Sequence, residues 1–192
     1  MSQQYTNKQR EILEISTNYI AKNGMLNFSL RNIAQEIGIK QASIYSHFNS
    51  KEEILRGIFE LYKQDVLTYY ETLEGLNTSK FTKLKMYFLK MSEFIQYKPE
   101  YMNLVWFEIY QYRDLFKDEL NFVIQTIIDI INNTPNTDEN IQEIINYEYA
   151  SINILGVLHI FLKKKLLNNS FDALSEAEKY WDNLEKILIC NF

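Results

Sequence analysis

The chain has 192 residues, of which 46% are hydrophobic, so it is long enough for a substantial hydrophobic core. Five glycines and two prolines are few, which favours an all-helical chain over a sheet, and the single cysteine excludes an internal disulfide. The formal net charge is −5, but the first 50 residues carry five lysines and arginines against three glutamates, so this end of the chain can approach nucleic acid.

The first helix is predicted over residues 7–23. Thr6 and Gln9 have the spacing of a capping box, in which the side chain of each residue pairs with the backbone of the other. Gly24 follows the last residue of the pattern and ends the helix. Residues that recur at helical spacing form its inward stripe: Ile12, Ser16, Tyr19 and Ile20.

Two short helices joined by a tight turn are predicted within residues 28–51. Ser29 can cap the first helix with its hydroxyl, and Gly38 tolerates the positive φ that a helix-ending turn usually demands. The second helix, over residues 41–48, would span roughly 12 Å, which suits a DNA major groove about 12 Å wide. The spacing of Ala34, Gly38 and Ile44 is typical of a helix-turn-helix. The anchoring residues of both helices share an inward face: Ile33, Ala34, Ile37, Ile44 and Phe48.

Two segments carry a family resemblance. The runs ILEISTNYIAKNG and FSLRNIAQEIGIKQASIYSHFNSKEEIL resemble the DNA-binding domain of the TetR family of transcriptional regulators, over roughly residues 8–60. The run IYSHFxSKEE is the most specific part of the match. Ala42 stands where the family often has glycine, and Ser43 where it often has threonine, so the operator sequence is not carried over.

The resemblance implies an all-α fold with a helix-turn-helix DNA-binding domain of three helices at residues 1–50 and a helical-bundle domain for ligand binding and dimerisation at residues 74–192. Ser50 and Glu53 form a second capping box, which opens a linking helix over residues 51–73. Hydrophobic periodicity predicts further helices over residues 80–97, 100–113, 114–131 and 138–167, and a last helix that a third capping box opens at Ser175 and Glu178.

The predicted partner of the N-terminal domain is a double-stranded DNA operator. Gln41 and Ser43 can bond to base edges, whereas the family motif places Tyr45 and His47 at the DNA backbone. Lys51 lies at a helix N-terminus, where a phosphate is favourable. The alternatives are a packed helix end for Tyr45 and His47 and a solvated side chain for Lys51. The full set of expected DNA-binding residues is Ser29, Arg31, Lys40, Gln41, Ala42, Ser43, Tyr45, His47 and Lys51.

Aromatic residues of the body suggest a pocket for a small-molecule effector, with plain core packing as the alternative. The inward stripes of the helices that begin near residues 80 and 114 hold no lysine or arginine, so we expect an apolar or aromatic effector rather than a strongly anionic one. The expected ligand-binding residues are Tyr87, Met91, Phe94, Trp106, Phe107, Tyr110, Phe122 and Tyr147.

The last two helices carry more apolar residues than one inward face requires, so they must be covered on more than one side. In the TetR family two such helices pair with their copies, which implies a homodimer. The expected interface consists of Ile152, Leu155, His159, Trp181, Leu184 and Leu188. His159 has no cysteine, aspartate or glutamate at ligand spacing, which favours packing over metal binding. Cys190 follows Ile189 and is expected to be packed.

Motifs of catalysis are lacking: the sequence has no glycine-rich phosphate loop, nucleophile elbow or HExxH. We therefore expect neither an enzyme nor a cofactor. No apolar run reaches the ~20 residues of a membrane-spanning helix, and the N-terminus has no apolar signal core, so we expect a cytoplasmic protein. The leading interpretation is a homodimeric transcriptional repressor that a small molecule releases from its operator. The alternative is a helical small-molecule-binding or protein-interaction protein that retains the N-terminal domain only as a fold.

Overall fold

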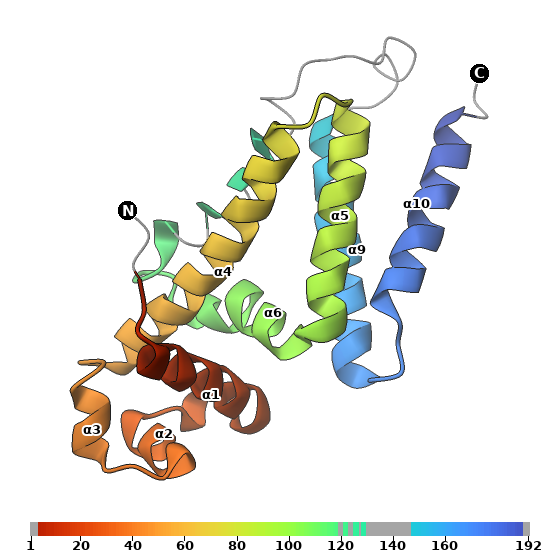
Figure 1. Cartoon of the computed structure of the whole chain (residues 1–192). Coiled ribbons are helices and arrows are strands. Elements are labelled where there is room, and N and C mark those ends of the chain that lie inside the picture. The colour runs from red at the N-terminus through yellow and green to blue at the C-terminus, as the bar shows by residue number, and fades with distance from the viewer. Residues whose placement is uncertain (1–3, 119–120, 123–124, 127, 130–146, 190–192) are drawn as a thin grey trace. The chain divides into compact units, whose positions relative to one another are not determined.

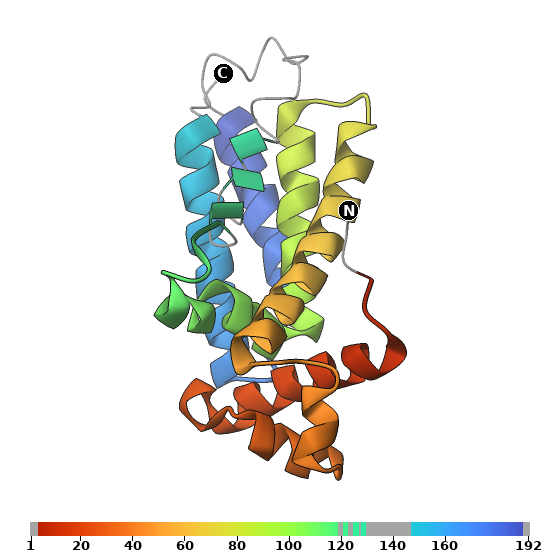
Figure 2. The same ribbon diagram turned by 90° about the vertical axis from the view of Figure 1, so that its left-hand side faces the viewer.

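A computed structural model describes residues 4–118, 121–122, 125–126, 128–129 and 147–189 (Figures 1 and 2). All regular elements of this part of the chain are helices, which confirms the predicted all-α fold. None of them is both long and apolar enough to cross a membrane. The elements are α1 (Asn7–Asn23), η1 (Met25–Asn27), α2 (Leu30–Ile37), α3 (Gln41–Tyr45), α4 (Lys51–Glu74), α5 (Lys80–Tyr97), α6 (Pro99–Trp106), η2 (Glu108–Tyr112), α9 (Tyr147–Leu167) and α10 (Ala173–Ile189).

The chain divides into two compact units that alternate along the sequence. Unit 1 comprises Met1–Leu67 and Glu100–Leu120, and unit 2 comprises Thr68–Pro99 and Asn121–Phe192. Helix α4 therefore contributes to both units, and the segment after Pro99 packs with the N-terminal part of the chain. The assignment of DNA binding to residues 1–50 and of ligand binding to residues 74–192 stays a prediction.

Helix α1 has the bounds that its local signals predict. The Gln9 backbone N–H donates to the Thr6 hydroxyl at 3.3 Å, and the Gln9 side chain accepts from the Thr6 backbone N–H at 3.0 Å, so the capping box is complete. Gly24 ends the helix with a φ of 80°. Ile12 and Ile20 are buried, as the inward stripe requires.

The helix-turn-helix forms as predicted, with a shorter second helix. The Ser29 hydroxyl accepts from the Asn32 backbone N–H at 3.2 Å, and Gly38 adopts the left-handed conformation at φ 79° and ψ 29°. Helix α3 ends at Tyr45 instead of Phe48. Phe48 is nevertheless buried, with its ring centroid 6.5 Å from that of Tyr5, and its backbone N–H still bonds to the Ile44 carbonyl at 2.9 Å.

The rest of unit 1 consists of the first part of α4 and residues 100–118. The Ser50 hydroxyl accepts from the Glu53 N–H at 3.1 Å, but the Glu53 carboxylate accepts from the Asn49 N–H at 2.6 Å, so only half of the predicted capping box forms. The predicted helix over residues 100–113 ends at Trp106, and the 3-10 helix η2 follows. The Trp106 indole donates to the Tyr62 hydroxyl at 3.0 Å, which fixes the end of α6 on α4.

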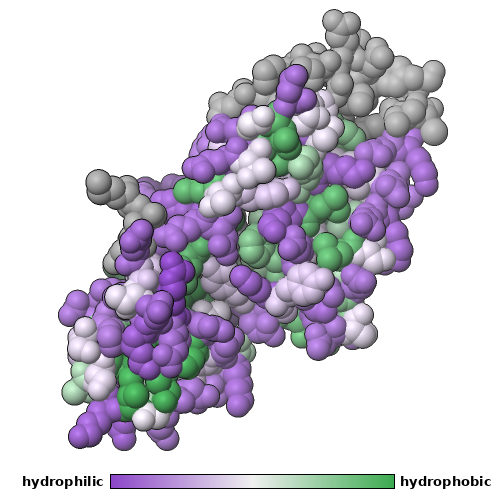
Figure 3. All heavy atoms as spheres, in the orientation of Figure 1, coloured by the Kyte–Doolittle hydropathy of each residue, from purple (hydrophilic) through white to green (hydrophobic). Residues whose placement is uncertain are grey.

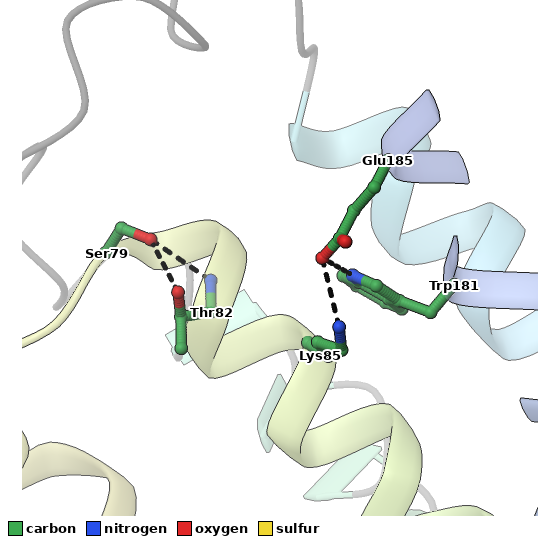
Figure 4. A network of polar contacts seen from close by, with 5 residues as sticks. All are labelled: Ser79, Thr82, Lys85, Trp181 and Glu185. Atoms are coloured by element: carbon green, nitrogen blue, oxygen red, sulfur yellow. Dashed lines mark hydrogen bonds and ion pairs between the residues drawn. The ribbon is translucent and has the colours of Figure 1, made fainter. Parts of the chain in front are cut away.

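Unit 2 is built on α5, α9 and α10, which lie side by side (Figures 1 and 2). Phe88 of α5 is fully buried, with ring centroids 6.1, 5.5 and 5.6 Å from those of Phe161, Tyr180 and Trp181. The Glu185 carboxylate joins α10 to α5, because it accepts from the Trp181 indole at 3.0 Å and from the Lys85 ammonium at 3.1 Å (Figure 4).

The start of α10 corrects the sequence prediction. The Asp172 carboxylate accepts from the N–H groups of Leu174 and Ser175, both at 3.1 Å, so the helix begins at Ala173 and Ser175 is not its cap. The Gln96 side chain of α5 accepts from the Ala173 N–H at 2.9 Å and fixes this start in space. The helix predicted over residues 114–131 and the first part of the one predicted over residues 138–167 fall partly outside the described residues.

Candidate nucleic-acid interface

The residues predicted to bind DNA lie within or directly beside α2 and α3 and in the first turn of α4. Five of them are exposed: Arg31, Lys40, Gln41, Ala42 and Ser43. Tyr45 is 48% exposed, and Ser29, His47 and Lys51 are half-buried. The space-filling view shows mainly hydrophilic residues over the α1–α3 region, with some hydrophobic residues between them (Figure 3). Polar groups of several kinds are therefore available to a nucleic acid, although each individual contact stays a prediction.

The exposed face is held in place by a buried one. Ala34 of α2 and Ile44 of α3 are 2% and 0% exposed, so the two helices pack through small and branched residues. The Gln9 side chain of α1 donates to the His47 carbonyl at 3.3 Å and fixes the chain that leaves α3. Packing on this buried side thus holds α3 in one orientation, with its other side exposed.

Two of the predicted DNA contacts already have roles inside the fold. The Ser29 hydroxyl caps α2 by accepting from the Asn32 N–H, and its own proton can still be donated to a phosphate. The Lys51 ammonium donates to the Tyr112 hydroxyl at 3.1 Å and lies 5.2 Å from the centroid of the Tyr112 ring. Sequence reasoning missed Tyr112, because no local pattern connects residues that lie 61 positions apart.

A second cation of α4 contacts the same segment. The Arg56 guanidinium donates to the Leu115 carbonyl at 3.0 Å and stacks on the Phe116 ring at 4.9 Å from its centroid. Phe116 is fully buried and its N–H bonds to the Tyr112 carbonyl at 3.1 Å, so residues 112–116 form one turn that is anchored on α4.

The predicted effector residues are divided between the two units. Tyr87 and Met91 are buried in α5, and Phe94 is half-buried beneath the ammonium groups of Lys90 and Lys98, 5.3 and 5.7 Å from its ring centroid. In unit 1, Trp106 and Phe107 are half-buried and Tyr110 is 58% exposed. Phe122 is half-buried in unit 2, and the side chain of Tyr147 lies outside the description. That these residues line one pocket stays a prediction.

Two tyrosines of unit 1 beside α6, Tyr62 and Tyr101, are largely shielded from solvent. Burial raises the pKa of Tyr62, and burial followed by the charge of Asp65 raises the pKa of Tyr101. The Tyr101 hydroxyl donates to the Ile58 carbonyl of α4 at 3.2 Å, and its ring meets that of Tyr62 edge-on at 6.1 Å. These bonds satisfy polar groups that would otherwise be costly to bury.

The predicted interface residues have different exposures. Ile152 of α9 is 60% exposed, His159 is exposed, and Leu155 and Leu184 are half-buried. Trp181 is only 1% exposed, because Phe81 and Phe88 of its own chain cover it, so it offers almost no surface to a partner. The Leu188 side chain and Cys190 lie outside the part of the chain that the structure describes. Among the described residues no group of three or more His, Cys, Asp or Glu side chains could hold a metal ion.

Comparison with known proteins identifies the N-terminal segment. The model of the family described as bacterial regulatory proteins, tetR family, matches residues 12–58. The HTH-type transcriptional repressor KstR2 of Rhodococcus jostii is 35% identical over 85 residues, which cover 38% of this chain and 42% of that protein. KstR2 of Mycolicibacterium smegmatis is 26% identical over 95 residues, which cover 50% and 46%. The matches thus span less than half the length of these curated relatives.

Solved structures share the fold over nearly the whole chain. The fatty acid degradation regulator FadR from Bacillus halodurans has a TM-score of 0.73 at 15% identity and covers 92% of this chain and 94% of its own. The ketosteroid transcriptional regulator KstR2 of Mycobacterium tuberculosis has a TM-score of 0.72 at 18% identity, covering 96% and 95%. FadR from Bacillus subtilis in complex with stearoyl-CoA has a TM-score of 0.67 at 18% identity, covering 91% and 95%. Residues 12–58 thus match the tetR family of bacterial regulatory proteins, which supports the predicted resemblance, and the solved structures share the fold of the chain.

Proposed function

We propose that this chain is a transcriptional repressor that binds operator DNA through its helix-turn-helix. The observation that carries the proposal is the exposed side of α3, where the polar side chains of Gln41 and Ser43 are exposed while Ile44 is buried. Five helical residues cover roughly 7.5 Å, which fits within a major groove about 12 Å wide. Buried support on one side and free hydrogen-bonding groups on the other are what reading a base sequence requires.

The contacts divide into two classes in this proposal. Gln41 and Ser43 bond to base edges and determine which sequence is preferred. Arg31, Tyr45 and Lys51 bond to phosphates and determine affinity and its dependence on salt. The phosphate at the N-terminus of α4 would also accept from backbone N–H groups and lie at the positive end of the helix dipole.

For the effector we propose a small molecule with a large apolar part, bound by the aromatic residues of the body. The named relatives support this chemistry, since one is a ketosteroid regulator and another was solved with stearoyl-CoA. Binding would favour a conformation with low affinity for the operator, so release is a shift between two populations. A repressor that reads two half-sites also needs two copies of its helix-turn-helix. The 60% and 53% exposure of Ile152 and Ile160 on α9 supports dimerisation through this helix.

The test is binding to DNA from immediately upstream of the chain's own gene, measured by gel shift and by fluorescence anisotropy over a series of salt concentrations. We expect saturable binding that an unlabelled specific fragment displaces at a much lower concentration than unrelated DNA. The logarithm of affinity should fall linearly with the logarithm of salt concentration, because bound phosphates release counterions. No binding to any native DNA at low salt would overturn the proposal.

A further inference from the structure

We propose that Tyr112 competes with DNA for the ammonium group of Lys51. While the segment from η2 to Phe116 stays on α4, the tyrosine holds this cation in an internal contact and lowers the affinity for DNA. The inference rests on the proposed function, in which Lys51 binds a phosphate. It adds an autoinhibitory contact between two side chains of the same unit.

The Lys51 ammonium is hydrogen-bonded to Tyr112 in this structure. The Lys51 ammonium lies 3.1 Å from the Tyr112 hydroxyl oxygen but 5.2 Å from the ring centroid, so it sits toward the hydroxyl end of the ring. There it donates a hydrogen bond to the hydroxyl oxygen, which is the main interaction of the pair. Lys51 is the first residue of α4, where the positive end of the helix dipole is unfavourable for a cation. The hydroxyl of Tyr112 gives the Lys51 ammonium a hydrogen-bond acceptor, which offsets part of this unfavourable position.

The anchoring of the segment makes the contact persistent. Arg56 holds the Leu115 carbonyl at 3.0 Å, and the buried Phe116 packs beneath its guanidinium. Tyr112 is thus positioned by a turn that is fixed to α4 independently of Lys51. In both ribbon views the green segment that contains η2 lies above α2 and α3 (Figures 1 and 2).

Competition follows from the reach of the lysine side chain. Its flexible stem lets the ammonium turn either to Tyr112 or to a phosphate beside α3 and the start of α4. Binding DNA therefore requires the contact between Lys51 and Tyr112 to break. The free energy of that contact is subtracted from the free energy that Lys51 gains by binding a phosphate. Any displacement of residues 112–116 from α4 removes this opposition and raises DNA affinity.

The experiment compares full-length Tyr112→Leu and Tyr112→Phe with the wild type by fluorescence anisotropy on the same operator fragment. A hydrogen bond of ordinary net strength corresponds to about two- to tenfold in affinity. Both Tyr112→Leu and Tyr112→Phe remove the hydroxyl that accepts from Lys51, so we expect both variants to bind DNA tighter by this factor. In a Lys51→Ala background Tyr112→Leu should have no effect. Tyr97→Leu, which removes a tyrosine that is 71% exposed on α5, is the matched control and should bind as the wild type does.

A second measurement works without DNA. The rate at which acetic anhydride acetylates Lys51, read by mass spectrometry against the exposed Lys40, should rise in Tyr112→Leu. An unchanged rate would overturn the inference, and so would unchanged or weaker DNA binding by a variant whose Lys51 reacts faster. Weaker binding would mean that Tyr112 supports Lys51 on the phosphate. If the wild type itself binds no DNA, the proposed function fails, and that result is distinct from either of these.

Discussion

Gly57 of α4 is where a single methyl group should have the largest effect on the packing of α4 against α1. A Cβ atom at this position would lie 2.7 Å from Leu13 Cδ2, 3.2 Å from Leu13 Cδ1 and 3.3 Å from the Tyr5 hydroxyl oxygen. Leu13 is 0% and Tyr5 8% exposed, so neither side chain can turn into solvent to make room. We expect Gly57→Ala to lower the free energy of unfolding.

The magnitude is the difference of two effects. Alanine is favoured over glycine inside a helix by about 1 kcal/mol. An extra methyl group in a well-packed core costs about 1–3 kcal/mol. The net loss should therefore be about 1 kcal/mol, read from urea denaturation followed by circular dichroism at one protein concentration. Leu13→Ala alone should cost about 2–5 kcal/mol, because it leaves a cavity.

Two comparisons make the test specific. Gly75 directly follows α4, and a Cβ there would meet only the Thr72 and Glu71 carbonyl oxygens at 3.7 and 3.8 Å, so Gly75→Ala should leave the free energy of unfolding within about 0.5 kcal/mol of the wild type. In the double variant of Leu13→Ala and Gly57→Ala the new methyl group fills part of the cavity, so the double loss should be smaller than the sum of the single losses. A Gly57→Ala protein as stable as the wild type, or strictly additive losses, would refute this account of the α1–α4 contact.

The other predictions concern DNA binding, assembly and pH. Lys51→Ala should weaken binding to all DNA sequences alike and lower the slope of the salt dependence by roughly one phosphate contact, and an unchanged slope would contradict its role. Gln41→Ala should change which bases are preferred in a selection from randomised DNA; a loss of affinity without altered preference would assign Gln41 to the backbone. Ile152→Glu combined with Ile160→Glu should yield monomers in analytical ultracentrifugation, and a persistent dimer would place the interface elsewhere. Because burial raises the pKa of Tyr101 above its ordinary 10.0, folding stability should fall as the pH rises beyond 10; titration of Tyr101→Phe should show a shallower fall.

Local signals predicted the helices whose ends depend on neighbouring residues. The bounds of α1 follow from Thr6, Gln9 and Gly24, which lie within one turn of its two ends. For α10 the spacing of Ser175 and Glu178 predicted a cap at Ser175, but Asp172, three positions earlier, caps the helix. A bond from the Ala173 N–H to the side chain of Gln96, 77 positions away, accompanies the choice of the earlier cap. No local pattern contains that information.

The candidate site also has one part that the sequence could predict and one part that it could not. The exposed residues of α3 were predictable, because the helix-turn-helix spacing determines which side is buried. The contact between Lys51 and Tyr112 was not, since it depends on how residues 100–118 return to α4. Trp181 illustrates a further limit. Periodicity indicated that α10 is apolar on more than one side, but it could not tell which side meets Phe81 and Phe88 of the same chain.

The interleaving of the two units has a consequence for synthesis on the ribosome. Unit 1 needs residues 100–120, so a nascent chain that has emerged only as far as Leu67 lacks the partners of Arg56 and Tyr62. The helix-turn-helix can form early from local contacts, but its support on α4 is completed only after all of α5 has been made. A fragment that ends at Leu67 would expose the aromatic side of α4 to solvent, and such a fragment would be prone to aggregate. A fusion of the helix-turn-helix to another protein would therefore have to include residues 100–120 as well.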